Sequence, residues 1–370
     1  PPRSTLFPYT TLFRSGTLEL GPSGEAAAAF LLQGTCSLSG FVHANQTVRV
    51  EGSITHGRAL ATAPIGMTNQ GIIRLECASD NSYADQSVTL AISSGWLRNE
   101  ANGRIEVSAA NGESRSIQGA VRNEGTVSIE GGISLGVSGS QAAFVQAGGG
   151  IVAANDPAPG SFLLEGGEFN WTGGALQGIV RARNTRVSVG DGVAQASTLR
   201  LVGSANRLVA NLSHRVTLWV EGTIGWGPAK LTAEAGAENR GAIQLETSSN
   251  NSYADQSSHL DCGPDGLLNA SGAVISTANG AGDVRSITGR LINRGRVEAG
   301  IETPFIGTLE AAGGTFAGPF RVRDSDLHVT GSPAEPTLID LVGPNNRLLT
   351  ETWPKRFSGW KATSRAVWHV

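Results

Sequence analysis

The sequence predicts an all-β fold: a right-handed single-stranded parallel β-helix (β-solenoid) of roughly a dozen rungs, spaced as neighbouring strands are. Three observations predict it. The chain contains a long internal repeat, a short turn motif recurs inside that repeat, and apolar residues alternate along the segment after each turn. Because each such strand has one apolar face, stacking on a like neighbour is the simplest way to bury that face.

The long repeat is marked by residues 81–87 (NSYADQS), which recur unchanged at 251–257, an offset of 170 residues. The same offset aligns the segment 115–117 (RSI) with 285–287. Farther along, the offset falls to 140, so about 30 residues within 131–174 have no second copy. A stack in which each rung contacts only its neighbours tolerates the loss of a whole rung, whereas a globular domain rarely would.

A shorter rhythm of 24 to 30 residues separates turns of the form Asn-x-Gly or Asn-x-x-x-Gly. Asn and Gly are expected to supply positive-φ corners, and like residues are expected to stack rung over rung. Ile73, Val127, Ile243 and Val297 should therefore be buried in parallel strands. The turns lie at Asn69 and Gly71, Asn99 and Gly103, Asn123 and Gly125, Asn239 and Gly241, Asn269 and Gly272, and Asn293 and Gly295.

The two ends of the chain differ from the repeat. Residues 1–15 resemble the translation of a short-read sequencing adapter, so we expect no fold there and a natural reading frame that begins near Gly16, inside a longer gene. Residues 16–349 are expected to form a continuous solenoid. Its long repeat covers about 20–195 and 196–336, with a third copy starting at about 337. Residues 350–370 add two of the three lysines and three tryptophans, and are expected to be a frameshifted tail.

Composition bears on several function classes. Charged residues make up 16% of the chain, below the roughly 25% of ordinary globular domains, and the formal net charge is −3. We found no clustered basic face, so no nucleic-acid partner is expected. No apolar run approaches the roughly 20 residues of a membrane span, so no membrane-spanning segment is expected. The three cysteines do not recur with the repeat, and neither a cofactor nor a metal site is expected.

The duplicated NSYADQS segment is the candidate binding site. An aromatic ring beside amide and carboxylate groups suits a sugar, through stacking and polar pairing. The alternative is a structural corner in which Tyr covers the core edge and Asp bonds backbone amides. Calcium fits less well, because the segment lacks enough converging oxygen ligands. The candidate glycan contacts are Tyr83, Asp85, Gln86, Tyr253, Asp255 and Gln256.

No catalytic residue is predicted. The six histidines occupy unrelated phases of the repeat, and none has the spacing of a helical metal motif. A polysaccharide lyase or glycoside hydrolase would need its acidic and basic groups to interrupt the repeat at one place. The charged residues instead recur with the repeat or scatter. We therefore expect a non-enzyme, with these two enzyme classes as the alternative.

The turn-and-strand pattern, the NSYADQS segments and the RSI motifs together resemble bacterial surface β-helix repeat proteins. They are similar to the passenger regions of autotransporter adhesins and to filamentous-haemagglutinin-like proteins. Residues 167–174 (GEFNWTGG) resemble a glycine-tryptophan rung motif of such arrays. This resemblance implies secretion, display on the bacterial outer surface, and a rigid stalk or adhesin role. The partners it implies are host or matrix glycans or proteins, and a glycan-binding module is a further alternative.

Overall fold

The computed structural model describes residues 10–23, 26–78, 85–108, 114–130, 134–154, 161–247, 255–278, 284–330, 339–350 and 366–367. The chain divides into two compact units, Pro1–Ala182 (unit 1) and Arg183–Val370 (unit 2). Strands, turns and irregular segments make up the described part of both units, without a helix. In particular, these ranges contain no helix long and apolar enough to cross a membrane.

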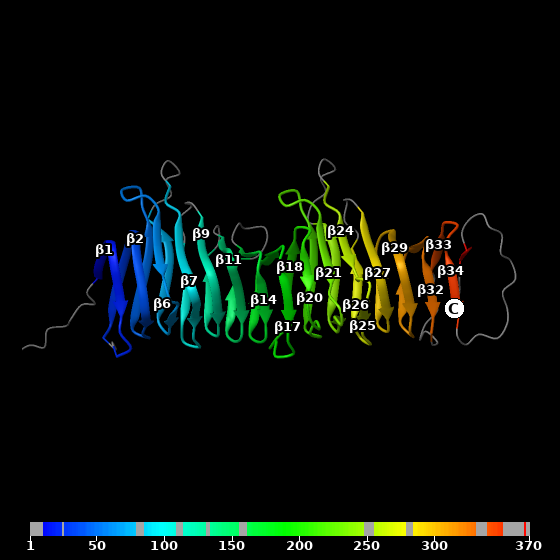
Figure 1. Ribbon diagram of the computed structural model, residues 1–370, viewed down its shortest axis with the longest axis horizontal. Helices are drawn as coiled ribbons and strands as arrows, with labels where there is room; N and C mark the ends of the chain where they lie inside the picture. The colour runs from blue at the N-terminus through cyan, green and yellow to red at the C-terminus, as the bar shows by residue number, and fades with distance from the viewer. Residues whose placement is uncertain are drawn as a thin grey trace, which may run out of the picture. The chain divides into compact units, whose positions relative to one another are not determined.

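Unit 1 is built from short strands joined by turns (Figure 1). They are β1 (Thr10–Leu20), β2 (Ala28–Val42), β3 (Gln46–Gly52), β4 (Ala59–Ala63), β5 (Met67–Asn69), β6 (Ile72–Cys77), β7 (Val88–Asn99), β8 (Arg104–Val107), β9 (Arg115–Asn123), β10 (Thr126–Ile129), β11 (Leu135–Gln146), β12 (Gly150–Val152), β13 (Phe162–Glu165), β14 (Glu168–Trp171) and β15 (Ala175–Gln177), with β16 (Val180–Arg183) at its end.

Unit 2 has the same construction. Its strands are β17 (Arg186–Val189), β18 (Ser197–Val202), β19 (Asn206–Leu208), β20 (Val216–Gly222), β21 (Ala229–Ala233), β22 (Glu238–Asn239), β23 (Ala242–Thr247), β24 (Ser258–Asp261), β25 (Leu267–Asn269), β26 (Val274–Thr277), β27 (Arg285–Asn293), β28 (Arg296–Ala299), β29 (Thr303–Ala311), β30 (Thr315–Ala317), β31 (Phe320–Arg323), β32 (Asp326–Val329), β33 (Asp340–Val342), β34 (Arg347–Thr350) and β35 (Ala366–Val367).

Strands pair in parallel with strands two or three places further along the chain. In unit 1, β3 pairs with β6, β6 with β8, β8 with β10, β10 with β12 and β12 with β15, all in parallel. In unit 2, β18, β20, β23, β26, β28 and β30 form a corresponding parallel series. The predicted all-β class with many parallel strands is therefore confirmed.

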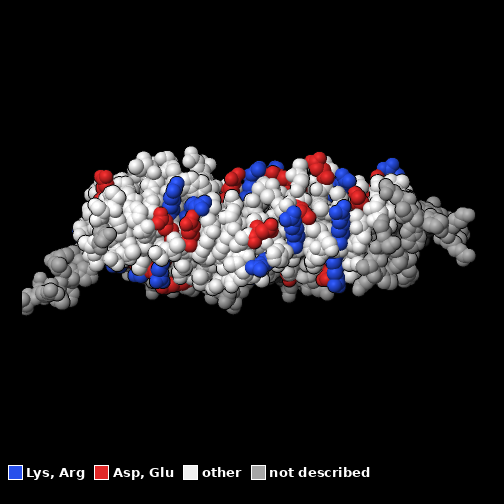
Figure 2. Space-filling model, turned by 90° about the horizontal axis from the view of Figure 1, so that it is seen from below, with Lys and Arg blue, Asp and Glu red and all other residues white. Residues whose placement is uncertain are grey.

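The core of each unit is a column of aliphatic side chains. In unit 1, Ile73 pairs with Ile105, Ile105 with Val127, and Val127 with Ile151. In unit 2, Ile243 pairs with Ile275 and Ile275 with Val297. At 0–1% exposure these side chains are removed from water, so their predicted burial in parallel strands is confirmed. The intervening residues face outward, where Figure 2 shows positive and negative groups lying next to one another.

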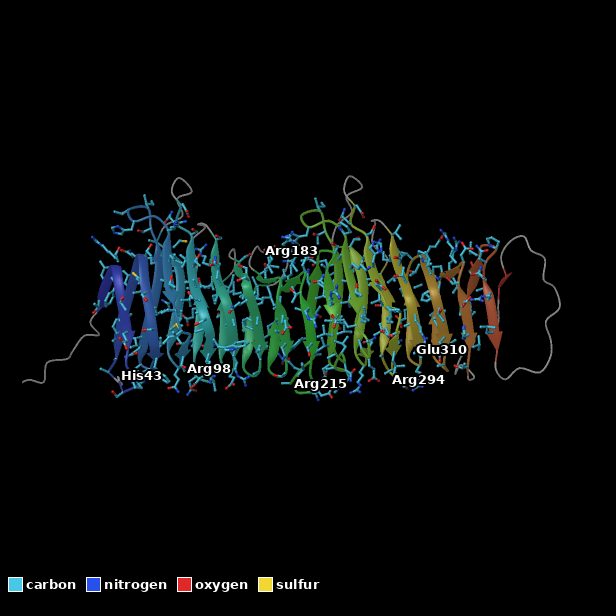
Figure 3. The ribbon with its side chains drawn as sticks, in the orientation of Figure 1. His43, Arg98, Arg183, Arg215, Arg294 and Glu310 are labelled. Carbon is cyan, nitrogen blue, oxygen red and sulfur yellow. The ribbon has the colours of Figure 1, made fainter. Side chains whose placement is uncertain are left out.

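The Asn residues of the turns stack on one another through their side-chain amides. In unit 1, Asn69 Nδ2 donates to Asn99 Oδ1 at 2.7 Å, Asn99 Nδ2 to Asn123 Oδ1 at 2.6 Å, and Asn123 Nδ2 to Gln146 Oε1 at 2.9 Å. These buried amides form the amide ladder of unit 1 and confirm the predicted stacking of Asn on Asn. Arg98, next to Asn99 in sequence, marks this edge at the lower ends of the strands in Figure 3.

Unit 2 has its own amide ladder. Asn239 Nδ2 donates to Asn269 Oδ1, and Asn269 Nδ2 donates to Asn293 Oδ1, both at 2.8 Å. All three asparagines are buried. The ladder satisfies amides that would otherwise be costly inside the fold.

The expected positive-φ corners are wrong for these turns. Among the described non-glycine residues only Asn184 and Asp324 have positive φ, and of the glycines in the predicted turns only Gly272 does. The other predicted turns have glycine for a different reason. A Cβ at Gly103 would lie 2.3 Å from the backbone oxygen of Asn69, and one at Gly125 would lie 2.1 Å from that of Gly103. Close approach between neighbouring turns therefore explains these glycines.

The stretch without a second copy carries an aromatic cluster. Phe169 and Trp171, from the Gly-Trp motif, are fully buried. Phe144 stacks on Phe169 with ring centroids 5.9 Å apart, and Phe162 meets Phe144 edge-on at 4.9 Å. Large rings here fill the interior of unit 1.

Residues 10–15, for which we expected no fold, lie in β1 and pair in parallel with β2. The register shifts between Phe13 and Ser15, and regular burial begins only beyond Gly16, at Leu18 and Leu20. Threonine and aromatic residues tolerate an extended conformation, so a neighbouring strand can template them. Residues 1–9 lie outside the described residues. So does most of the expected tail, apart from Thr350 and from β35, which pairs antiparallel with β33.

Candidate functional site

The structure describes part of the duplicated NSYADQS segment. Tyr83 and Tyr253 lie outside the described residues. The carboxylate of Asp85 accepts hydrogen bonds from the Ser87 hydroxyl at 2.6 Å and from the Ser87 backbone N–H at 3.0 Å. Asp255 accepts the same two bonds from Ser257, at 2.6 and 2.9 Å. These bonds, with the hydroxyl contributing most, lower the pKa of both carboxyl groups.

Gln86 and Gln256, the other candidate contacts, have fully buried side chains. Their backbone oxygens lie very close to glycines of neighbouring strands. A Cβ at Gly52 would lie 2.0 Å from the Gln86 oxygen, and one at Gly222 would lie 1.9 Å from the Gln256 oxygen. A ligand in solvent therefore does not reach these two glutamines. Of the candidate contacts that the structure describes, only the aspartates lie at the surface.

A short hairpin stands beside each aspartate. In unit 1, Ser53 and Gly57 exchange backbone hydrogen bonds of 2.9 and 2.7 Å, and Ser53 Oγ accepts from the His56 N–H at 3.1 Å. Ile54 at the tip is 49% exposed. A Cβ at Gly57 would lie 3.7 Å from the backbone oxygen of Asp85, which places hairpin and aspartate side by side.

The hairpin of unit 2 repeats this arrangement. Thr223 and Gly227 exchange bonds of 3.0 and 2.8 Å, and Thr223 Oγ1 accepts from the Trp226 N–H at 3.0 Å. Ile224 is 51% exposed. In Figure 1 each hairpin projects from the upper ends of its strands, between β3 and β4 and between β20 and β21. Hairpin and aspartate together form one exposed corner in each unit.

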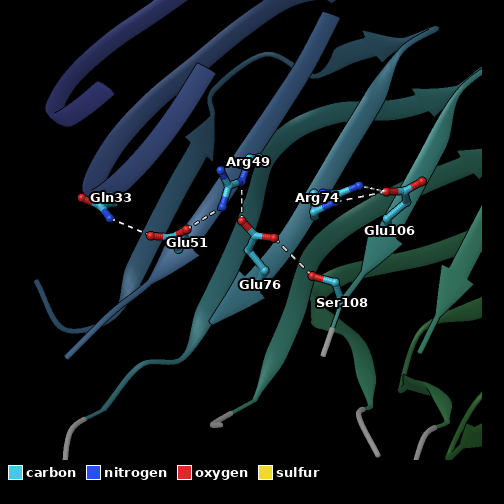
Figure 4. A network of polar contacts seen from close by, with 7 residues as sticks. All are labelled: Gln33, Arg49, Glu51, Arg74, Glu76, Glu106 and Ser108. Atoms are coloured by element: carbon cyan, nitrogen blue, oxygen red, sulfur yellow. Dashed lines mark hydrogen bonds and ion pairs between the residues drawn. The ribbon is translucent and has the colours of Figure 1, made fainter. Parts of the chain in front are cut away.

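An ion-pair network covers the outer face of β3, β6 and β8 (Figure 4). Arg49 pairs with Glu51 at 2.9 Å and also with Glu76. Gln33 donates to Glu51 at 2.8 Å, and Arg74 pairs with Glu106 at 2.6 Å. The Glu106 hydrogen bond is the main cause that raises the pKa of Arg74. Each of these carboxylates therefore has an arginine partner in the network.

The same face of unit 2 is built differently. Trp219 occupies the repeat position of Arg49, and the guanidinium of Arg200 lies 4.3 Å from its ring centroid. Arg200 also pairs with the fully buried Glu221 at 3.1 Å. Stacking and charge pairing together hold this arginine.

A polar cluster that sequence reasoning missed lies on the outer face of β21, β24 and β27. Lys230, His259 and Ser286 are aligned by parallel pairing, and His259 Nδ1 lies 2.8 Å from Ser286 Oγ. Lys230 Nζ pairs with Asp261 at 2.7 Å. Burial, reinforced by Lys230 and opposed by Asp255, lowers the pKa of His259. The register of consecutive strands, which places residues 27 apart side by side, could have identified this pair.

A shallow hollow of about 490 Å³ adjoins this cluster, lined by Arg207, Glu234, Asp261 and Asp265 among others. Within the hollow, the charge of Glu234 is compensated by two arginines, Arg207 at 3.7 Å and Arg186 at 3.0 Å. Within the described ranges no group of three or more His, Cys, Asp or Glu side chains is arranged to hold a metal ion.

Comparison with known proteins gives no assignment: no family model matches the chain, and no curated protein sequence matches it significantly.

Proposed function

We propose that this chain is a non-catalytic structural segment of a secreted or surface-displayed bacterial repeat protein, acting as a rigid stalk or adhesin. The fold we propose is the right-handed single-stranded parallel β-helix, with roughly a dozen rungs at the usual strand spacing. Parallel pairing at every second or third strand, with like residues in register, supports it.

The observation that carries the proposal is which residues the two copies share. The buried amides Asn69, Asn99 and Asn123 recur as Asn239, Asn269 and Asn293. Outward residues such as Arg49 and Trp219 differ. Repetition that keeps the stacked turn amides while outward residues change favours a role that depends on shape and length.

The test is a purified full chain examined in two ways. Small-angle scattering should give an extended particle whose cross-section stays constant along its length. Incubation with neutral and uronate-containing glycans should release no product. A compact particle, or turnover abolished by one point substitution, would overturn the proposal.

The enzyme alternative has one observation in its favour. Lys230, His259 and Asp261 interrupt the repeat, because unit 1 has Leu60, Thr89 and Ala91 at the same positions. A neutral imidazole 2.8 Å from a serine hydroxyl can accept its proton. If glycan or ester turnover is found, His259→Thr should abolish it. Turnover that survives this substitution would place any catalysis elsewhere.

A further inference from the structure

We propose that the outward face of β5, β7 and β9 in unit 1 binds a carboxylated glycan chain, with Trp96 stacking on a sugar ring and Arg98 binding a carboxylate. This inference names a ligand class for the adhesin role proposed above, and in that sense rests on it.

The pairing of the strands brings these groups to one face. Thr68 pairs with Arg98 and Arg98 with Arg122, all in parallel register. Leu97 and Asn99 are buried, so the alternating residues Trp96 and Arg98 both face outward. Figure 3 shows Arg98 at the lower ends of the strands of unit 1.

Trp96 is held in place while its ring stays accessible. The backbone of Gly66 packs so tightly on the backbone of Trp96 that a Cβ at Gly66 would lie 2.7 Å from its oxygen. Ser94 Oγ donates to the Pro64 oxygen at 2.7 Å and ties the two turns together. Trp96 is nevertheless 37% exposed, and Ile65 beside it is 77% exposed. An exposed indole on a fixed backbone suits the apolar face of a pyranose ring.

Arg98 supplies the charge for a ligand. Its side chain makes no ion pair or hydrogen bond with any residue that the structure describes. Its neighbour Arg122 pairs with Glu124 at 2.8 Å. Glu124 balances the charge of Arg122, so Arg98 is the arginine of this pair that is left to form a charge-assisted bond with a ligand carboxylate.

The neighbouring acidic groups favour a sugar over a nucleic acid. Glu124 lies beside Arg122, and Glu100 accepts from Gln70 Nε2 at 2.6 Å, two residues from Arg98. Sugar hydroxyls can donate to such carboxylates, whereas a phosphate chain needs an uninterrupted row of cations. A chain that alternates carboxylates with hydroxyls matches this alternation of charge.

Unit 2 provides an internal control. The repeat positions of Trp96, Arg98 and Arg122 hold Gly266, Leu268 and Ile292 there. The equivalent face therefore has the same backbone pairing without the ring or these two arginines. Arg290 lies beside Gly266 there and pairs with Glu310 at 3.1 Å.

The test is calorimetry on the full chain with galacturonate and hyaluronan hexasaccharides. The methyl-esterified galacturonate hexamer serves as the uncharged match, and a single-stranded oligodeoxynucleotide as the phosphate match. We expect at least one carboxylated hexamer to bind, and Trp96→Ala and Arg98→Gln each to weaken it about tenfold. Leu268→Ala in unit 2 should leave the affinity unchanged. Added salt should weaken binding, because a charged contact is involved.

Several outcomes would overturn the inference: no binding of either carboxylated hexamer, equal binding of the esterified hexamer or the oligonucleotide, or unchanged affinity in both variants. Circular dichroism and thermal unfolding of each variant, matched to the parent chain, exclude loss of fold as the cause. If no hexamer binds but scattering still shows an extended particle, the glycan site is wrong and the proposed structural role is unaffected. Cleavage of a hexamer would instead count against the non-catalytic role.

Discussion

The two units share one plan of strands and turns, and they differ at many outward positions and also at some buried ones, such as Val88 and its counterpart Ser258. In unit 1 the amide ladder includes Asn99, and in unit 2 its counterpart Asn269 makes the same two amide contacts. The aspartate-serine turns also agree to within 0.1 Å in both hydrogen bonds. Outward positions show the opposite behaviour: Thr89 in unit 1 corresponds to His259 in unit 2, and Trp96 to Gly266.

This contrast separates two kinds of constraint. Interior and turn residues must fit a neighbour above and a neighbour below, which restricts the side chains that can replace them. Outward residues contact mainly solvent and each other, and can acquire new partners singly. A surface group found in one unit alone is therefore a better candidate for function than one found in both, and Trp96 and His259 both qualify.

The largest effect that we predict concerns a turn where the copies differ in backbone. Gly103→Ala places a Cβ 2.3 Å from the Asn69 oxygen, so we expect it to destabilise unit 1 by about 3 kcal/mol. Unit 2 carries Ala273 at this position, preceded by Gly272 with a φ of 82°. The double variant Asn102→Gly, Gly103→Ala adopts that order and should recover most of the loss. Urea unfolding of the full chain measures both.

Two results would contradict this account of the turn. A single Gly103→Ala variant as stable as the parent chain would mean that the neighbouring turns move apart easily. A double variant no better than the single one would mean that Gly272 does not make room for Ala273.

The next effect tests whether the two ladders are equivalent. Asn99→Ala and Asn269→Ala each remove an amide that donates to one Asn and accepts from another, inside a buried stack. We expect each to lower the free energy of unfolding by about 2 kcal/mol, because buried partners lose their hydrogen bonds. Gln70→Ala is the matched control. Its amide bonds Glu100 at the partly exposed edge, and its loss should cost about 0.5 kcal/mol. Equal effects of all three substitutions would remove the ladder's special role.

The fold class and the ladder could be predicted from sequence because they depend on residues that recur at fixed spacing. Alternation put Ile73 and Val127 on one face, and recurrence of Asn predicted stacking. The conformation of the turn glycines could not be predicted in this way. Glycine is required both where φ is positive and where a neighbouring backbone comes close, and the sequence does not distinguish these causes.

The candidate site was harder to predict for a related reason. Gln86 is polar and lies in a duplicated surface segment, yet its side chain is fully buried. Whether a glutamine is buried depends on the partners that the fold offers, which one segment does not show. Likewise, His259 and Ser286 meet through strand register, and whether Arg98 has a partner among the described residues depends on which residues face its strand. Such relations require the register to be known.

A smaller effect distinguishes the units by pH. Burial lowers the pKa of His259 below its ordinary 6.5, so the folded state favours the neutral ring. Above pH 6.5 the ring is neutral in both the folded and the unfolded chain, so it costs no stability. As the pH falls from 6.5 toward the lower folded pKa, the unfolded chain takes up a proton first, and the free energy of unfolding decreases. His259→Thr installs the residue of unit 1, where Thr89 Oγ1 pairs with Ser116 Oγ at 3.0 Å. Between pH 7 and 5 we expect the free energy of unfolding of this variant to fall by about 0.5 kcal/mol less than that of the parent chain. An unchanged pH profile by thermal unfolding would contradict the assignment.

The smallest effect concerns the matched aspartates. The pKa of Asp85 and of Asp255 is lowered chiefly by the hydroxyl of Ser87 or Ser257, so each carboxylate stabilises its turn above its ordinary pKa of 3.8. That contribution is lost as the pH falls through the folded pKa, below 3.8. Asp85→Ala and Asp255→Ala should therefore lower the thermal midpoint slightly and equally at pH 7, and the difference from the parent chain should vanish at strongly acidic pH.

The charged neighbours of the two aspartates differ: Arg58 lies near Asp85, and His259 lies near Asp255. If the two effects differ only below pH 6.5, protonation of His259 explains the difference. If the two losses of thermal midpoint already differ at pH 7, the two turns contribute unequally to stability even though their hydrogen bonds have the same lengths.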